Sequence, residues 1–107
     1  MLKPWGMEEL IESNDVYAVK RIHYAPGHRT SLQRHDVKRE TLVIIAGAID
    51  IEVGGSTWRM EEGDQVTIQP GQVHRMTGGQ PDGGTALEIS SPELDDLVRL
   101  EDDYGRV

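Results

Sequence analysis

The chain has 107 residues, of which 36% are hydrophobic and 28% charged, and its formal net charge is −8. A chain of this length folds as one domain with a modest core, so residues 1–107 are treated as a single domain. The negative charge opposes binding to a phosphate backbone, and no apolar run approaches the roughly 18 residues of a membrane-spanning helix. Neither nucleic acid nor a membrane is therefore an expected partner.

The opening residues, MLKPWGMEEL, contain neither a positive region followed by an apolar stretch nor a small-residue cleavage site. A secretory signal is therefore not expected, and the sequence predicts a cytoplasmic protein. Cysteine is absent, which excludes disulfides, thiolate metal sites and cysteine nucleophiles. Nitrogen and oxygen atoms must supply the ligands of any metal.

Short runs rich in β-branched or alternating apolar residues follow one another along the chain. They are residues 16–24 (VYAVKRIHY), 40–47 (ETLVIIAG), 48–55 (AIDIEVGG), 65–69 (QVTIQ), 73–77 (VHRMT) and 85–90 (TALEIS). The second and third runs meet near Gly47 and resemble a hairpin, followed by a turn at Gly54-Gly55. Short strands separated by Gly and Pro predict an all-β antiparallel sandwich or barrel.

The C-terminal tail has a different pattern. Pro92 follows Ser91 and could start a helical turn, and the apolar residues beyond it have a rough helical spacing. These residues are Leu94, Leu97, Val98 and Leu100. We expect a short helical or irregular tail after the last strand.

Four polar residues form the candidate functional site. If a strand ends at His35, the alternation of side chains places Gln33 and His35 on one face. The polar segment DVKR is suited to a turn, which lets Glu40 open the next strand facing inward, and His74 starts another strand after the turn at residues 70–72. Two imidazoles, a carboxylate and an amide oxygen suit Mn, Fe, Co, Ni or Zn better than Ca or Mg.

Two spaced motifs carry a resemblance to a known family. Gly27, Gln33, His35, Glu40 and Gly47 are separated by five, one, four and six residues, and Gly63, Gln69, Gly71 and His74 by five, one and two. This pair resembles the two motifs of the cupins, with Gln33 in the place of the first histidine. KPWGMEEL, YAVKRIHYAPGHRTSLQRH and LVRLEDDYGR are similar to segments of the type II mannose-6-phosphate isomerases, from Lys3 to Arg106.

The resemblance implies a cupin double-stranded β-helix, or jelly-roll barrel, often dimeric. It also implies one divalent transition metal, held here by Gln33, His35, Glu40 and His74, and an aldose-ketose isomerase acting on a sugar phosphate. The chain departs from the family at Lys38, where the family has arginine, and at Thr41-Leu42, where it has histidine and tryptophan.

Other candidate residues have ordinary alternative explanations. Arg29 and Arg106 are candidates for binding a substrate phosphate through the planar guanidinium, but either could equally be a surface arginine paired with acid. Lys38 is a candidate catalytic residue only because it occupies the family's arginine position. The general base of an isomerase is not identifiable from the sequence.

Three functions remain open, so the sequence does not decide whether the protein is an enzyme. The first is a metal-dependent sugar-phosphate isomerase of the mannose-6-phosphate isomerase type. The second is a metal-containing cupin of another reaction, oxygenase or epimerase-like, because two histidines and a carboxylate also serve oxygen chemistry. The third is a non-catalytic cupin that binds a sugar or metabolite, which the changes at Lys38, Thr41 and Leu42 favour.

Overall fold

The computed structural model describes residues 1–107 as strands and turns, with no helix. The strands are β1 (Leu2–Lys3), β2 (Gly6–Ser13), β3 (Ala18–Tyr24), β4 (Leu32–Arg34), β5 (Glu40–Val53), β6 (Ser56–Glu61), β7 (Gln65–Ile68), β8 (His74–Gly78), β9 (Gly84–Ser90) and β10 (Val98–Glu101). Nothing in the fold is a helix of the length and apolarity needed to cross a bilayer.

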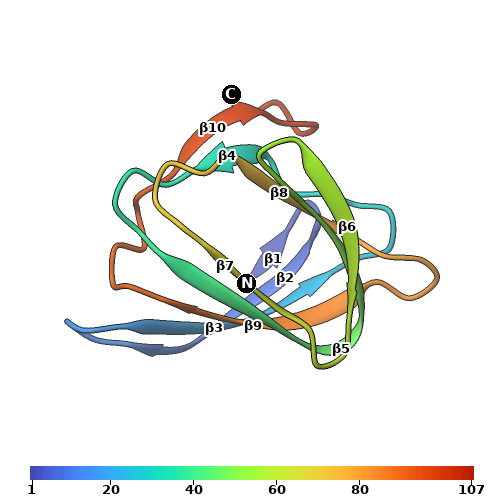
Figure 1. The fold of residues 1–107 in the computed structure, drawn as a ribbon, viewed down its shortest axis with the longest axis horizontal. Helices are drawn as coiled ribbons and strands as arrows, with labels where there is room; N and C mark the ends of the chain where they lie inside the picture. The colour runs from blue at the N-terminus through green and yellow to red at the C-terminus, as the bar shows by residue number, and fades with distance from the viewer.

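The strands form two antiparallel sheets that share the long strand β5. One sheet has the order β1-β2-β3-β9-β5-β7, and the other has the order β6-β5-β8-β4-β10. The sheets curl toward each other into a barrel, with β3 and β9 along one side and β4 and β10 on the opposite side (Figure 1). The predicted all-β cupin architecture is confirmed.

Strand β5 corrects the predicted hairpin at Gly47. Residues 40–53 form one continuous strand rather than two, and Gly47 lies within it at φ 67°. A Cβ at Gly47 would lie 2.2 Å from the carbonyl oxygen of Gly83, so only glycine fits this close approach. The strand bends there and passes from one sheet to the other, whereas the chain reverses at Gly54-Gly55, as predicted.

The two ends of the chain also form strands. The tail is irregular from residue 91 to 97 and then pairs with β4 through β10, so its apolar spacing does not produce a helical turn. Strand β2, which sequence reasoning missed, pairs along β3 and has mostly exposed side chains. Exposed residues give strand β2 little of the alternation that identifies a half-buried strand.

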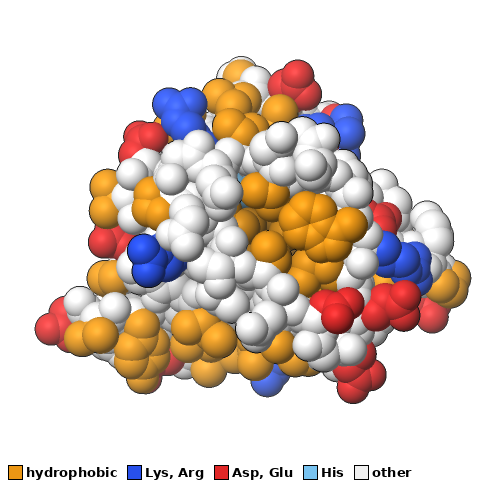
Figure 2. Space-filling view, in the orientation of Figure 1, with side chains coloured by type: hydrophobic (Ala, Val, Ile, Leu, Met, Phe, Trp, Pro, Cys, Tyr) orange, Lys and Arg blue, Asp and Glu red, His pale blue; other side chains and the backbone are white.

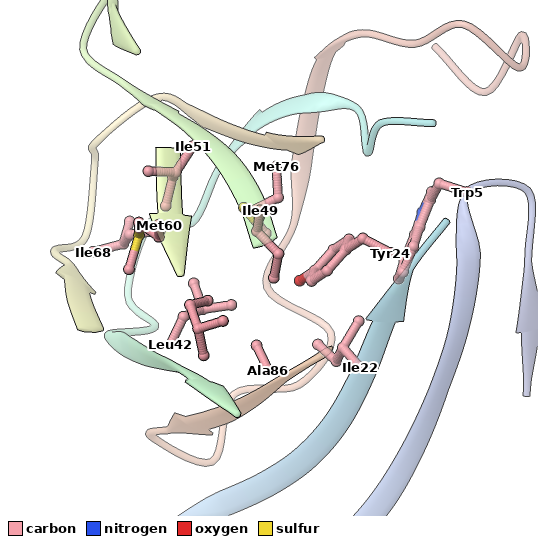
Figure 3. Packing of buried hydrophobic residues seen from close by; sticks show 11 residues of the cluster. Trp5, Ile22, Tyr24, Leu42, Ile49, Ile51, Met60, Ile68, Met76 and Ala86 are labelled. Atoms are coloured by element: carbon pink, nitrogen blue, oxygen red, sulfur yellow. The ribbon is translucent and has the colours of Figure 1, made fainter. Parts of the chain in front are cut away.

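The interior of the barrel has an apolar layer beside a polar one. The core cluster contains 11 buried residues: Trp5, Ile22, Tyr24, Leu42, Ile44, Ile49, Ile51, Met60, Ile68, Met76 and Ala86 (Figure 3). Along β9, the first inward-facing side chain, Ala86, is apolar, and the next two, Glu88 and Ser90, are polar and buried. Glu88 lies opposite Lys20 on β3, and Ser90 lies opposite Glu40 on β5. The polar layer contains the candidate site.

Candidate metal centre

His35, Glu40 and His74 converge inside the polar layer. Glu40 opens β5, His74 opens β8, and His35 follows β4, so three strand ends bring them together. All three are buried, and one potential ligand atom from each lies within 4.8 Å of the others. The Nε2 atoms of His35 and His74 lie 3.0 Å and 3.1 Å from the same atom, Oε1 of Glu40. Glu40 therefore faces inward after the DVKR turn, beside His35, as the sequence predicted.

Backbone carbonyls orient both imidazoles. The Nδ1 atom of His35 donates to the Asp96 carbonyl at 2.6 Å, and Nδ1 of His74 donates to the Gln72 carbonyl at 2.9 Å. Because a carbonyl oxygen only accepts, each neutral ring carries its proton on Nδ1 and its lone pair on Nε2. Two nitrogen lone pairs and a carboxylate oxygen then face one another, which is favourable only with protons or a cation between them. The donor set fits a divalent transition metal.

Gln33 stands at the edge of this group. Its Oε1 accepts a hydrogen bond from the Ser31 hydroxyl at 2.7 Å, and its Nε2 lies 3.5 Å from Nε2 of His74. A half-turn of the amide would exchange the two atoms and place the oxygen beside His74, while the Ser31 hydroxyl could accept instead of donate. Gln33 is thus within reach of the centre as a fourth ligand through its amide oxygen.

The charges around Glu40 keep it ionised. Burial alone would raise its pKa, but the neighbouring carboxyl of Glu88, the two imidazoles and the Lys38 charge hold the pKa of Glu40 well below its usual range. Burial and then the Glu40 charge raise the pKa of Glu88 well above its usual value. Lys38 Nζ lies 3.8 Å from Glu40 Oε2 and 4.0 Å from Glu88 Oε2. One carboxylate and one carboxylic acid therefore share a buried lysine.

A cavity of about 370 Å³ opens beside the centre. Gln33 and His35 form part of its wall, and Lys38, Glu88, Tyr24 and Arg99 also line it. Burial, then the charges of Glu88 and Glu40, raise the pKa of Tyr24 well above its usual value, so the phenol stays protonated. Its hydroxyl points toward the middle of the barrel and has no hydrogen-bond partner (Figure 3). The volume and the mixture of apolar and polar walls suit a small polar ligand.

The structure separates the two predicted arginines. Arg29 does not line the cavity: it is exposed and makes a bidentate ion pair with Asp103, at 2.6 Å and 2.9 Å. Arg106 does line the cavity, but Asp102 holds it in the same bidentate way, and this pairing keeps the pKa of Asp102 well below its usual range. Both arginines stabilise the C-terminal tail in this structure.

Sequence reasoning missed three side chains of the cavity: Glu88, Tyr24 and Arg99. A signal existed for Glu88, since it stands at an inward position of TALEIS between Ala86 and Ser90, where an apolar residue is the norm. Arg99 could not be found, because its side of the tail depends on the pairing of β10 with β4.

An all-β double-stranded barrel with two histidines and a glutamate converging in its interior is a cupin with a candidate metal centre. The chain belongs to the family described as mannose-6-phosphate isomerase C-terminal, which its sequence matches over residues 1–102.

Curated relatives are much longer than this chain. It is 33% identical over 108 residues to the mannose-1-phosphate guanylyltransferase ManC of Salmonella typhimurium, a match that covers 98% of this chain and 22% of ManC. The chain spans less than a quarter of the length of the relatives it matches in this way.

Solved structures agree with the fold. KdgF from Halomonas sp. superposes with a TM-score of 0.81 at 18% identity, covering 90% of this chain and 88% of that one. The DMSP lyase DddQ from Ruegeria pomeroyi superposes with a TM-score of 0.78 at 19% identity, covering 92% and 53%. At these identities the likeness extends to the barrel alone, because one fold supports many reactions.

Proposed function

We propose that the protein is a metal-dependent isomerase of the mannose-6-phosphate isomerase type, which interconverts an aldose phosphate and a ketose phosphate. The observation that carries this proposal is the convergence of His35, Glu40 and His74 beside a cavity with both polar and apolar walls, to which His35 contributes. Family membership supports the substrate class, because the family and the relative ManC are both named for a mannose phosphate.

The reaction moves one hydrogen from C2 to C1 of the open-chain sugar and one from O2 to O1. A bound divalent metal would polarise the carbonyl and the adjacent hydroxyl oxygen. Glu88 and Lys38 are the titratable side chains next to Glu40 that are not candidate ligands, and both are buried in the cavity wall. We assign the proton transfer to Glu88, which in its ionised form would take the proton from C2 and return it to C1, while the Lys38 charge favours that ionised form and holds the two carboxyl groups in place.

Two of the three departures from the family have positions that leave this chemistry intact. Thr41 lies on the outer face of β5, where its hydroxyl contacts that of Thr67 at 2.8 Å, and Leu42 is buried in the apolar core. Neither lines the cavity, whereas Lys38 does. The case for a purely binding cupin therefore depends on Lys38 alone.

The direct test incubates the metal-loaded protein with mannose 6-phosphate and measures fructose 6-phosphate. Formation of the ketose phosphate that stops on chelation supports the proposal. Absence of the product with each of Zn, Mn, Fe, Co and Ni would overturn it, and calorimetric binding without turnover would favour the non-catalytic function instead.

We also propose a homodimer formed through the outer face of β3 and β9. Val19, Leu87 and Ile89 point outward from these strands, and hydrophobic side chains gather along the lower edge of the molecule (Figure 2). Arg21 lies on the same face, opposite Leu87, and pairs with Glu9 of β2 at 2.9 Å, so this face presents apolar side chains together with one ion pair. Sedimentation of the wild type as a dimer and of Ile89→Lys as a monomer is expected; a monomeric wild type would refute this proposal.

A further inference from the structure

The position of Arg99 in the barrel is not evident from the residues around it in the sequence. In the ladder between β10 and β4, Arg99 lies directly opposite Gln33, the candidate fourth ligand. Residues opposite each other in an antiparallel pair share a face, with Cβ atoms about 5 Å apart. The side chain of Arg99 therefore lines the cavity next to the centre.

Arg99 is also the one cationic side chain of the cavity wall without an ion pair. The other cationic side chains there each contact a carboxylate: Lys3 and Lys20 contact Glu8, Lys38 contacts Glu40 and Glu88, and Arg106 contacts Asp102. Arg99 forms no ion pair, and its Nε is buried without a hydrogen-bond partner. In a chain with a net charge of −8, carboxylates are abundant, yet none is within ion-pair distance of this guanidinium.

Arg99 as a whole is half-buried, but its Nε is a buried donor without an acceptor, which is costly, and native structures satisfy nearly all such groups. An anionic oxygen of a bound ligand would satisfy it. The guanidinium fork matches the paired oxygens of a phosphate or a carboxylate, and the unpartnered hydroxyl of Tyr24, which lines the same cavity, offers a second polar contact, suited to a hydroxyl group.

We propose that Arg99 anchors the phosphate group of the substrate while the hydroxyl-bearing end of the same molecule reaches the centre formed by His35, Glu40 and His74. The ligand class is a small polyhydroxylated phosphate monoester. This assignment rests on the proposed function for its choice of phosphate, and it replaces the predicted phosphate contacts at Arg29 and Arg106, both of which are occupied by aspartates.

The test measures binding by calorimetry to metal-loaded protein, with mannose 6-phosphate, mannose and inorganic phosphate as ligands. The variants are Arg99→Gln, Arg99→Lys and the control Arg34→Gln. Arg34 belongs to the same ladder, opposite Val98, but it does not line the cavity and pairs with Asp36 at 3.2 Å. The control removes the same charge from the same pair of strands.

We expect Arg99→Gln to weaken binding of mannose 6-phosphate by roughly tenfold to a hundredfold, as for loss of a hydrogen bond between charged groups. Arg99→Lys should recover part of the loss, and mannose should bind all these proteins alike. Arg34→Gln should bind as the wild type does. Equal effects of Arg99→Gln and Arg34→Gln would overturn the assignment, as would a wild type that binds neither phosphate ligand at millimolar concentration.

Turnover separates this inference from the proposed function. Binding of mannose 6-phosphate that depends on Arg99, without formation of a ketose phosphate, would leave the anchor standing and refute the isomerase. Turnover with the same KM in the wild type and in Arg99→Gln would support the isomerase and refute the anchor.

Discussion

Asp96, in the C-terminal tail, forms hydrogen bonds both with the side chain of His35 and with the loop that follows His35. Its backbone carbonyl accepts the Nδ1 hydrogen bond of His35 at 2.6 Å, and its carboxylate accepts backbone N–H bonds from Asp36, Val37 and Lys38 at 3.0, 2.6 and 2.8 Å. The loop fixed in this way connects His35 to Glu40. The tail thereby sets the distance between two of the candidate ligands.

Replacement of Asp96 by alanine is therefore expected to weaken metal binding although Asp96 is not a candidate ligand. Groups that orient ligands typically change metal affinity by about tenfold to a hundredfold. Competition with a chelator of known affinity measures the change. Asp95→Ala is the matched control, because Asp95 is exposed and its carboxylate makes no hydrogen bond; an equal loss in both variants would contradict the account.

The same carboxylate predicts a dependence of stability on pH. Hydrogen bonds from the backbone N–H groups of Lys38, Val37 and Asp36 lower the pKa of Asp96 to about 2, from an ordinary value of 3.8. The unfolded chain therefore takes up this proton more readily than the folded one, and the stabilisation is complete above about pH 4 and is lost as the pH falls toward 2. The difference in Tm between the wild type and Asp96→Asn should be constant above about pH 5 and shrink below pH 4.

Glu88→Gln tests the assigned proton carrier. The amide keeps the size of the side chain but cannot exchange a proton, so we expect turnover to fall by about a hundredfold or more, with metal content unchanged. Isotope exchange at C2 of the sugar, followed by NMR, should fall in parallel. Full activity in this variant would assign the proton transfer to another group.

Tyr24→Phe tests whether the buried hydroxyl serves a ligand rather than the fold. The hydroxyl has no hydrogen-bond partner, while the ring stacks on Trp5 with centroids 5.1 Å apart. Removal of the oxygen alone should leave the free energy of unfolding unchanged or raise it by about 1 kcal/mol, and should weaken sugar-phosphate binding. Tyr24→Ala, which deletes the ring, should cost about 3–5 kcal/mol. Clear destabilisation by Tyr24→Phe would show that the hydroxyl supports the fold.

Much of the fold followed from local patterns, and the errors have physical causes. Alternation and turn residues located strands β3, β7, β8 and β9 to within a few residues. The predicted hairpin at Gly47 was wrong because a glycine with positive φ can bend a strand as well as end it, and only the contact with Gly83 distinguishes the two outcomes. The tail was misjudged because pairing with a distant strand outweighed its weak helical spacing.

The candidate site was also predictable in part, because local sequence patterns determine some of its geometry. Gln33, His35 and Glu40 lie close in sequence, so strand alternation and one turn were enough to bring them together. Partners for the arginines depend on contacts far apart in the chain, such as Arg29 with Asp103. Sequence alone therefore could not show that Arg29 and Arg106 are paired and that Arg99 is free.

The most direct test of the central claim is the metal content of the protein and of three histidine variants, measured by elemental analysis after loading and removal of excess metal. The wild type and His28→Ala, which changes an exposed histidine, should each retain about one equivalent of a divalent transition metal, and His35→Ala and His74→Ala should retain none. A wild type that stays metal-free, or histidine variants that keep the metal, would contradict a metal centre built from His35, Glu40 and His74.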